Sequence, residues 1–434
     1  MTPAKPKGWL GVHPFVLLFL AALLLPTAVS LNLGGLRLSV YRIVLIIAFV
    51  PMLVTLLSGR AGRITLFDYL IFGHGIWSTL ALINWGGFAQ GLESGGIYVV
   101  EVVGAYLLGR VYIRGYDDFR AFARLLVYTV LATLPFTIPE ALTAVHILYD
   151  GIASLVGGPR APFIEPRMGL ERTFGSFDHP ILYGVFSASA FSLAYFVIAD
   201  KKIGSVTAMW KVGGIGVATF LSASGGPYVV LMMQMFIAGW ERVWGNTRGR
   251  WAALFGLFAL IYVSIDIFSN RTPFHVFVTY FTFSTTSAYN RILIFDYGMA
   301  EVLRHPLLGI GLGDWVRPAW MSDSMDNFWL LVAVRYGLPA WAMFVGAMLG
   351  LVWTIAQRQN LPEPWRRARH AWAFTLFGIT VAAATVHLWN ALFVLFVFLI
   401  GSGAWLLDAQ HRRGRSLTAA QPVTAQRAPM GRLF

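Results

Sequence analysis

Residues 287–338 read SAYNRILIFDYGMAEVLRHPLLGIGLGDWVRPAWMSDSMDNFWLLVAVRYGL and lie between two strongly apolar runs. The stretch itself carries arginines, histidines, carboxylates and a glycine-dense turn. The whole chain is 57% hydrophobic and only 12% charged, so polar groups concentrated in one such place require an explanation.

The composition indicates a membrane protein with many spans. Soluble domains are roughly 25% charged, about twice the fraction found here. The mean hydropathy is +0.66, and apolar runs recur that are long enough, at about 18 residues or more, to cross a hydrocarbon core of about 30 Å as a helix. We therefore expect an all-α polytopic membrane protein without a sizeable soluble domain.

Twelve membrane-spanning helices are predicted from these runs. The predicted spans are 9–26, 38–57, 66–84, 96–113, 121–139, 180–199, 206–222, 227–244, 251–268, 326–356, 371–387 and 389–408. The first run resembles a signal peptide, but the many later spans favour an uncleaved first helix. The tenth is long enough to be tilted or to begin below the outer surface. Residues 1–415 are thus predicted to form one transmembrane domain, followed by a disordered cytoplasmic tail at 416–434.

Basic residues give the predicted orientation. They occupy every alternate loop and both termini, which places these segments in the cytoplasm. On the opposite side the loops are short, except for about 140–179 and 269–325. Long loops in compact proteins are usually functional or disordered, and the aromatic content of these two favours folded structure.

Charge and cysteine content exclude several classes of function. The net charge of +13 is explained by retained cytoplasmic arginine and lysine, so no nucleic-acid partner is expected. Cysteine is absent, which excludes disulfides, thiolate metal sites and a cysteine nucleophile. No acidic cluster has metal-ligand spacing, and we expect neither a metal nor another cofactor.

The two long outer loops contain arginine but no lysine. Retention in the cytoplasm uses both residues about equally, so this bias favours the planar, bidentate contacts that guanidinium makes with carboxylate or phosphate. Some of these arginines are expected to pair with acids of the same loops. The arginines are Arg160, Arg167, Arg172, Arg271, Arg291, Arg304 and Arg317.

The first loop runs into the predicted span 180–199 as EPRMGLERTFGSFDHPILYG (165–184). Pro180 suits the first turn of a helix, so Arg172 is expected at the membrane face with Asp178 and His179 close to it. A helix-capping or core role for His179 is the simpler alternative.

In the second loop, apolar residues recur at helical spacing, which predicts a helix lying in the membrane interface. The stripe consists of Ala288, Ile292, Phe295, Met299 and Val302. His305-Pro306 ends this helix, and the GIGLG turn (309–313) follows. The turn has neither nucleotide-binding spacing nor a preceding strand, so tight backbone packing against a ligand or helix is favoured.

Three polar side chains, Asp323, Asp326 and Asn327, stand at the start of the tenth predicted span. One of them would serve as a helix N-cap, but one cap does not require three. An acid facing arginines from two other loops is also where a general base would be placed.

These motifs, in this order, resemble the O-antigen ligase and Wzy-type polysaccharide polymerase superfamily. The resemblance rests on the helix with Arg291, the following HPLLGIGLGDW, and Asp326-Asn327 followed by Gly337. RTFGSFDHPILYG (172–184) is similar to an earlier motif of that superfamily. The motifs cover about 165–345, and the rest of the chain agrees by topology only.

The resemblance implies a GT-C-like, metal-independent, inverting glycosyltransferase in the bacterial inner membrane, with its site at the periplasmic face of the lipid bilayer. The donor would be an oligosaccharide on undecaprenyl pyrophosphate and the acceptor another glycan. A chain-length regulator is compatible with it as a protein partner.

Carried over to this chain, the resemblance assigns Arg172 and Arg291 to the pyrophosphate and Asp326-Asn327 to the acceptor hydroxyl. Such a transfer needs cations on the departing diphosphate and a base on the incoming hydroxyl. The candidate bases, in order, are Asp326, His305 and Asp178. Further candidate substrate contacts are Arg167, His179, Arg304 and Trp315, the last by stacking on a sugar face.

Two departures from the family pattern matter. Asp326-Asn327 replaces the ligases' histidine and small polar residue, which favours a polymerase over a ligase. The SASGGP turn (222–227) lacks an arginine found in many members, so Arg167 is a candidate to supply that phosphate contact.

Two alternative functions stay open. One is a ligase that transfers the polysaccharide to lipid A core or another acceptor, and the other is a polysaccharide or lipid transporter. Transporters usually carry polar groups at mid-membrane in two similar halves, whereas here they gather at one face. Glu101 and His74 are ionisable residues deep in apolar sequence and so are functional candidates, Glu101 as an anchor for one of the outer-loop arginines and His74 as a bundle hydrogen-bond partner.

Overall fold

The computed structural model describes residues 11–33, 36–199, 206–280 and 285–408. Within these residues the only sheet is an antiparallel pair, β1 (Ser30–Leu33) with β2 (Leu36–Ser39). The helices are α1 (Pro14–Leu23), α2 (Val40–Leu57), α3 (Leu66–Val99), η1 (Val100–Gly104), α4 (Ala105–Tyr112), α5 (Tyr116–Thr143), α6 (Ile147–Ser154), α7 (Pro180–Ser189), α8 (Phe191–Leu193), η2 (Ala194–Ile198), α9 (Val206–Leu221), α10 (Gly225–Trp244), α11 (Arg250–Phe268), α12 (Pro273–Tyr280), α13 (Thr285–Arg304), α14 (Phe328–Ala356), α15 (Glu363–Ala382), α16 (Asn390–Ser402) and η3 (Ala404–Asp408).

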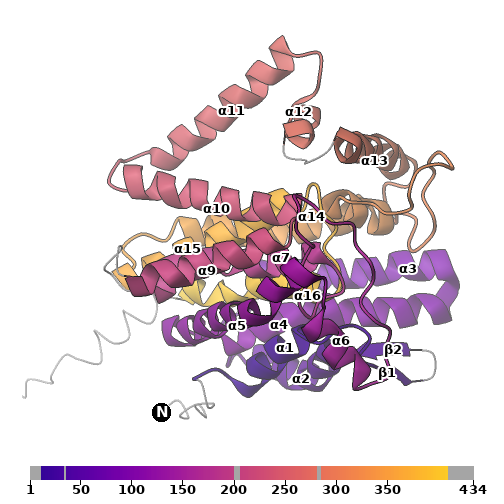
Figure 1. The fold of residues 1–434 in the computed structure, drawn as a ribbon, viewed down its shortest axis with the longest axis horizontal. Helices are drawn as coiled ribbons and strands as arrows, with labels where there is room; N and C mark the ends of the chain where they lie inside the picture. The colour runs from indigo at the N-terminus through magenta and orange to yellow at the C-terminus, as the bar shows by residue number, and fades with distance from the viewer. Residues whose placement is uncertain (1–10, 34–35, 200–205, 281–284, 409–434) are drawn as a thin grey trace, which may run out of the picture.

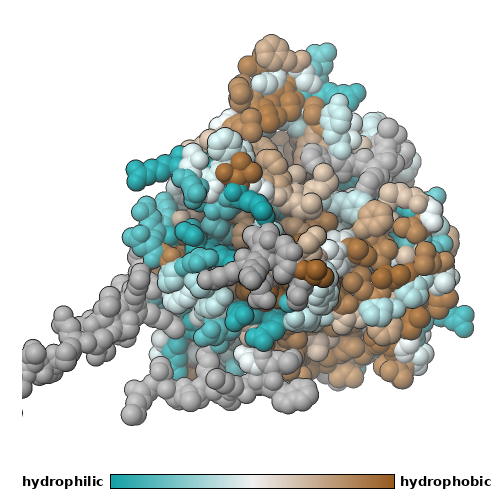
Figure 2. All heavy atoms as spheres, turned by 60° about the vertical axis from the view of Figure 1, so that its left-hand side comes forward, coloured by the Kyte–Doolittle hydropathy of each residue, from teal (hydrophilic) through white to brown (hydrophobic). Residues whose placement is uncertain are grey.

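Seven helices in the described part of the chain are long and apolar enough to cross a membrane. They are Val40–Leu57, Leu66–Tyr112, Tyr116–Thr143, Pro180–Ile198, Arg250–Phe268, Phe328–Ala356 and Asn390–Asp408. Many large apolar side chains are exposed, and Figure 2 shows a broad hydrophobic area beside a region where hydrophilic residues gather. The prediction of an all-α membrane protein is confirmed.

Helix α3 folds back on itself at Gly87, whose φ of +76° is outside the helical range. The Nε2 atom of His74, before the turn, lies 2.9 Å from the hydroxyl of Tyr98, after it. A straight helix would separate these residues by about 36 Å. The two arms are therefore antiparallel neighbours (Figure 1), and they correspond to the predicted spans 66–84 and 96–113.

Helix α14 also reverses direction, at Gly337 (φ +82°). The ring centroids of Phe328 and Phe344, which lie on opposite sides of the turn, are 6.0 Å apart, whereas a straight helix would place them about 24 Å apart. The prediction of one continuous span over 326–356 is therefore wrong. The first arm, Phe328 to Tyr336, is about 13 Å long, too short to cross the membrane alone.

The GIGLG turn (309–313) holds this reversal in place. The amides of Ile310 and Gly311 donate to the carbonyls of Val334 and Arg335, both at 2.9 Å. These carbonyls lie at the end of the first arm, where no further amide of the same helix is available to donate to them. The turn thus packs against a helix, one of the two alternatives predicted for it.

Helices α7 and α16 form the centre of the bundle, and α11 lies at its edge. Of the apolar windows in these segments, 83% of Pro180–Ile198 and 89% of Asn390–Asp408 are buried, but only 6% of Arg250–Phe268. Figure 1 shows α11 leaning away from the other helices. The segments that precede α7 and α16 therefore reach the middle of the molecule.

The two large loops predicted from the sequence are folded. The first contains α6, and the second contains α12 and α13, so the helix expected over 288–302 is present. The predicted first span, 9–26, contains the ten-residue α1. The predicted disordered tail, 416–434, lies outside the described residues.

Candidate functional site

Arg172 lies on a rigid turn in front of α7. The amides of Phe174 and Gly175 donate to Glu140 Oε1 at 2.9 and 3.3 Å, which fixes the turn to α5. The Nη2 atom of Arg172 donates to Ser224 Oγ, 2.8 Å away in the SASGGP turn. Its Nε atom is buried and has no hydrogen-bond partner among the residues that the structure describes. Burial lowers the pKa of Arg172 to about 10, so the guanidinium stays charged at neutral pH.

His179 caps α7, as the simpler alternative predicted. The amide of Ile181 donates to His179 Nδ1 at 3.1 Å, and Pro180 occupies the first turn. Because Nδ1 accepts this bond, the ring proton of the neutral imidazole is on Nε2. Burial, together with the charges of Arg172 and Arg167, lowers the pKa of His179 to about 4. His179 is therefore a neutral hydrogen-bond donor at physiological pH.

Arg167 stands on a tight hairpin beside these two residues. Arg167 and Leu170 exchange backbone hydrogen bonds of 3.0 Å, and Met168 and Gly169 between them both have positive φ, as a two-residue type I′ turn requires. The side chain of Arg167 is exposed. Its charge lowers the pKa values of Arg172, His179 and Arg291, so the hairpin brings it within electrostatic reach of all three.

Arg291 approaches from α13 and meets the loop between α15 and α16. Its Nε atom donates to the carbonyl of Thr385 at 2.9 Å. Burial lowers the pKa of Arg291, while the carboxylate of Asp326 acts in the opposite direction. Asp326 is thus close enough to Arg291 to compensate part of its charge.

The same loop receives the start of α14. The amide of Phe328 donates to the carbonyls of Ala383 and Val386 at 2.9 and 3.2 Å. Asn327 is the N-cap, and its Oδ1 accepts from the Leu330 amide at 3.1 Å. The prediction that one of the three polar residues here caps the helix is confirmed. Asp326, beside the cap, accepts from Ser324 Oγ at 3.1 Å.

Five of the residues predicted from sequence therefore lie together. We call Arg167, Arg172, His179, Arg291 and Asp326 the arginine cluster. Glu165 also acts on Arg172, and three arginines against the carboxylates of Asp326 and Glu165 still leave a net positive charge. Guanidinium groups suit a phosphate in a partly dry site. The cluster can therefore bind an anion next to a carboxylate able to accept a proton.

Two predicted residues at the other end of α13 have a different environment. Arg304 Nη1 lies 3.0 Å from Glu301 Oε2, and His305 Nε2 lies 3.5 Å from Glu301 Oε1. Arg304 is about 20 Å along the helix from Arg291. The structure thus pairs both with a loop carboxylate and does not bring them to the arginine cluster.

Trp315 and Asp178 also make structural contacts. The indole Nε1 of Trp315 donates to the carbonyl of Asp323 at 3.1 Å, and the side chain is buried. Asp178 Oδ1 accepts from the amide and hydroxyl of Thr27 at 3.2 and 3.0 Å. Asp178 therefore fastens the start of α7 to the segment after α1.

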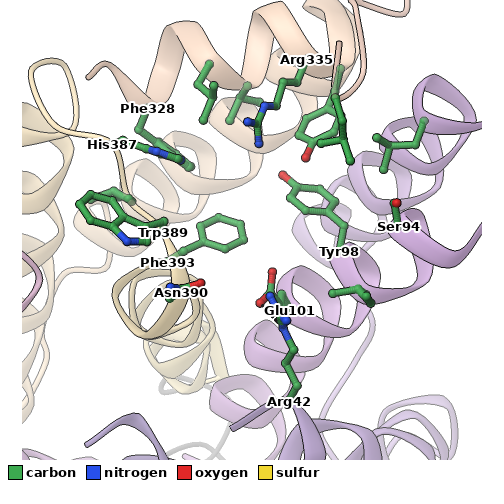
Figure 3. A pocket seen from close by; sticks show the side chains of 17 residues that line it. Arg42, Ser94, Tyr98, Glu101, Phe328, Arg335, His387, Trp389, Asn390 and Phe393 are labelled. Atoms are coloured by element: carbon green, nitrogen blue, oxygen red, sulfur yellow. Dashed lines mark hydrogen bonds and ion pairs between the residues drawn. The ribbon is translucent and has the colours of Figure 1, made fainter. Parts of the chain in front are cut away.

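A cavity of about 310 Å³ adjoins the arginine cluster through Trp389, whose ring centroid is 5.7 Å from that of His179. Figure 3 shows the guanidinium of Arg335 and the carboxylate of Glu101 pointing into it from opposite walls, with Tyr98 between them. We call it the polar cavity.

The sequence analysis missed most of the polar residues that line this cavity, including Arg42, Arg335 and His387. A signal was present, because Arg42 and Arg335 each interrupt an apolar run, in SVYRIVL and VAVRYGL. Glu101, predicted to anchor an arginine of the outer loops, pairs instead with Arg42 of α2 at 2.8 Å. His74, predicted to bond within the bundle, contacts the carbonyl of Ala340 at 2.8 Å.

Comparisons with known proteins add no relationship: no protein-family model matches the chain, and no curated protein matches it.

Proposed function

We propose that the protein is a bacterial inner-membrane glycosyltransferase that polymerises oligosaccharide repeat units carried on undecaprenyl pyrophosphate. In this proposal the chain crosses the membrane twelve times, both termini are cytoplasmic, and the arginine cluster faces the periplasm. The tenth crossing is then made by the second arm of α14. The observation that supports the proposal best is the convergence of three arginines from two separate loops beside one carboxylate.

The cluster matches the charges that the reaction develops. The acceptor hydroxyl oxygen bonds to the anomeric carbon as the bond from that carbon to the pyrophosphate oxygen breaks. The departing pyrophosphate gains one negative charge, which Arg172 and Arg291 stabilise where a divalent metal does so in other enzymes. Asp326 accepts the hydroxyl proton. A single displacement of this kind inverts the anomeric configuration.

His179 and Arg167 have supporting roles in this proposal. The Nε2–H of His179, held neutral, donates a hydrogen bond to the diphosphate without adding charge. Arg167 is exposed on its hairpin and closes over the diphosphate from the solvent side. Through Arg167 the chain makes up for the arginine that its SASGGP turn lacks.

The test is polymer length in the native bacterium carrying Arg291→Ala at wild-type protein level. We expect single repeat units attached to the surface, because the pyrophosphate loses a partly buried cation. Arg271→Ala, in an exposed part of the same loop, serves as the matched control and should leave the ladder unchanged. Long polymer retained on its carrier lipid would instead indicate a ligase. An unchanged ladder in Arg291→Ala would contradict the assignment of Arg291 and favour a transporter.

A further inference from the structure

The polar cavity has an apolar neighbour. A groove of about 360 Å³ runs between β2, the start of α2 and the second arm of α3. Its lining is mostly apolar and includes Leu36, Leu38, Ile46, Leu92 and Val100, with Glu93 and Arg42 as its two charged residues. Arg42 and Ile97 line both the groove and the polar cavity. These two side chains therefore lie in a wall that the two spaces share.

The groove faces the hydrophobic exterior of the bundle. Ile46 and Leu92 in its wall are among the exposed large apolar side chains. A Cβ atom added at Gly96, also in its wall, would meet no atom within 4 Å. An apolar chain can therefore enter the groove from the lipid without displacing protein atoms.

The polar cavity carries one uncompensated positive charge. The Nε atom of Arg42 lies 2.8 Å from Glu101 Oε1, which also accepts from the Tyr41 hydroxyl at 3.0 Å. Arg335, by contrast, has no carboxylate within ion-pair distance among the residues that the structure describes. A partly buried cation of this kind is stabilised by an anion.

The neighbours of Arg335 do not cancel its charge. His387, in the loop before α16, has its pKa lowered to about 4 by burial and by Arg335 itself, so it is neutral at physiological pH. Ser94 and Asn390 add neutral hydrogen-bonding groups to the lining. The cavity is therefore suited to a head group with one or more negative charges and further polar atoms.

We propose that the polar cavity and the apolar groove together bind one lipid molecule, with an anionic phosphate head at Arg335 and a single apolar chain in the groove. This lipid site is separate from the arginine cluster, although Trp389 connects the two. If the proposed polymerase reaction is correct, the lipid is the carrier of the acceptor sugar, and that role rests on the proposed function. The binding itself does not.

Photolabelling of the purified full-length protein tests the site without any need for activity. The probe is geranylgeranyl phosphate with a diazirine at the end of its chain, and labelled peptides are identified by mass spectrometry. We expect labels within 36–46 and 92–100. Arg335→Gln should reduce this labelling about 10-fold, as expected for the loss of a charge-assisted contact. Gly96→Phe should abolish it by filling the groove.

Each variant has a matched control. Arg271→Gln removes an exposed arginine, and Gly239→Phe fills a helical glycine in α10 where an added Cβ also meets no atom. Both should label like the wild type. Arg291→Gln should also leave these labels unchanged, because Arg291 belongs to the arginine cluster.

Three results would overturn the proposal. Equal labelling of wild type, Arg335→Gln and Gly96→Phe would show that the lipid does not use this site. If uncharged geranylgeraniol competes with the probe as strongly as geranylgeranyl phosphate does, the site is an apolar groove only. If inorganic phosphate competes equally strongly, the site binds an anion only. If labelling fails while Arg291→Ala still shortens the polymer, this inference falls and the proposed function stands.

Discussion

Arg110 in α4 and Arg172 before α7 are both buried, with 1% and 7% of their surface exposed, yet their surroundings differ. Each of the three guanidinium nitrogens of Arg110 is satisfied, by Asp68 Oδ1 at 3.1 Å and by the carbonyls of Ala61 and Arg63 at 2.6 and 2.8 Å. Arg172 donates to the neutral hydroxyl of Ser224, and its Nε has no partner within the described part of the chain.

The difference separates a structural arginine from one available to a ligand. A buried charge is tolerated when an opposite charge and hydrogen bonds replace the lost water. Arg110 has both, so its role is complete within the protein. Arg172 has no carboxylate within ion-pair distance among the described residues. The charge of Arg167 lowers the pKa of Arg172, and the charge of Glu165 offsets only part of this. A bound anion would supply the negative charge that the protein does not place next to Arg172.

The largest effect is expected for Arg110→Gln. The substitution leaves Asp68 buried without its cation, which costs about 3–5 kcal/mol of folding stability. Thermal unfolding of the purified protein in detergent measures the loss. Arg120→Gln, on an exposed position of α5, is the control and should unfold like the wild type. Equal stability of the two variants would contradict the structural role of Arg110.

Arg172→Gln should reduce activity without reducing stability, in contrast to Arg110→Gln. Removing an uncompensated buried cation leaves the unfolding temperature unchanged or raises it, because no carboxylate loses its partner. The polymerisation rate should fall about 10²–10³-fold, as when one contact that stabilises transition-state charge is removed. The rate is measured with purified protein and lipid-linked repeat units. If Arg172→Gln lowers both the unfolding temperature and the polymerisation rate, Arg172 would have a structural role like that of Arg110.

The third variant, Asp326→Asn, tests whether the carboxylate of the arginine cluster is the general base. If it accepts the hydroxyl proton, the rate should fall about 10²-fold or more, with little change in substrate binding. Asp323→Asn, three residues earlier and exposed, should retain the wild-type rate. Should Asp326→Asn bind substrate more weakly and keep its maximal rate, Asp326 would be a partner of Arg291 and not the base.

The motifs that flank predicted spans could be placed from sequence. Arg172, His179 and Asp326 each lie within a few residues of a helix start, and helix starts are readable from proline, capping residues and apolar runs. Arg304 and His305 belong to the same loop as Arg291, but Glu301 lies one helical turn before His305 and binds both. The i,i+3 and i,i+4 spacing from Glu301 to Arg304 and to His305 on the predicted helix is a signal for this pairing that the sequence already contains.

The reversal at Gly337 and the polar cavity were not predictable in this way. Gly337 and Pro339 are helix-breaking residues. Apart from Arg335, however, the sequence on both sides of Gly337 is mostly apolar, so hydropathy gives no sign that the chain reverses. The cavity then forms from α2, α3, α14 and the loop before α16, and contacts between such distant segments leave no local pattern. The arginines within apolar runs were the one available signal.

The smallest effect concerns the proton on His179, which lies beside Arg172. The pKa of His179 is about 4 in the folded protein and 6.5 as its ordinary value. As the pH falls from 6.5 towards 4, the unfolded chain binds a proton and the folded protein does not, so folding stability is lost across this window. His179→Asn keeps a capping acceptor and removes the titration.

The unfolding temperature should therefore fall less in His179→Asn than in the wild type between pH 6.5 and pH 4, by about 2–4 °C. His305→Asn, at an exposed histidine, should follow the wild-type curve. Since Arg172 is one of the charges that repel the proton, adding Arg172→Gln to the wild type should reduce the slope in the same direction. Parallel curves for wild type and His179→Asn would mean that neither burial nor the charge of Arg172 lowers the pKa of His179, and the contrast with Arg110 would lose this support.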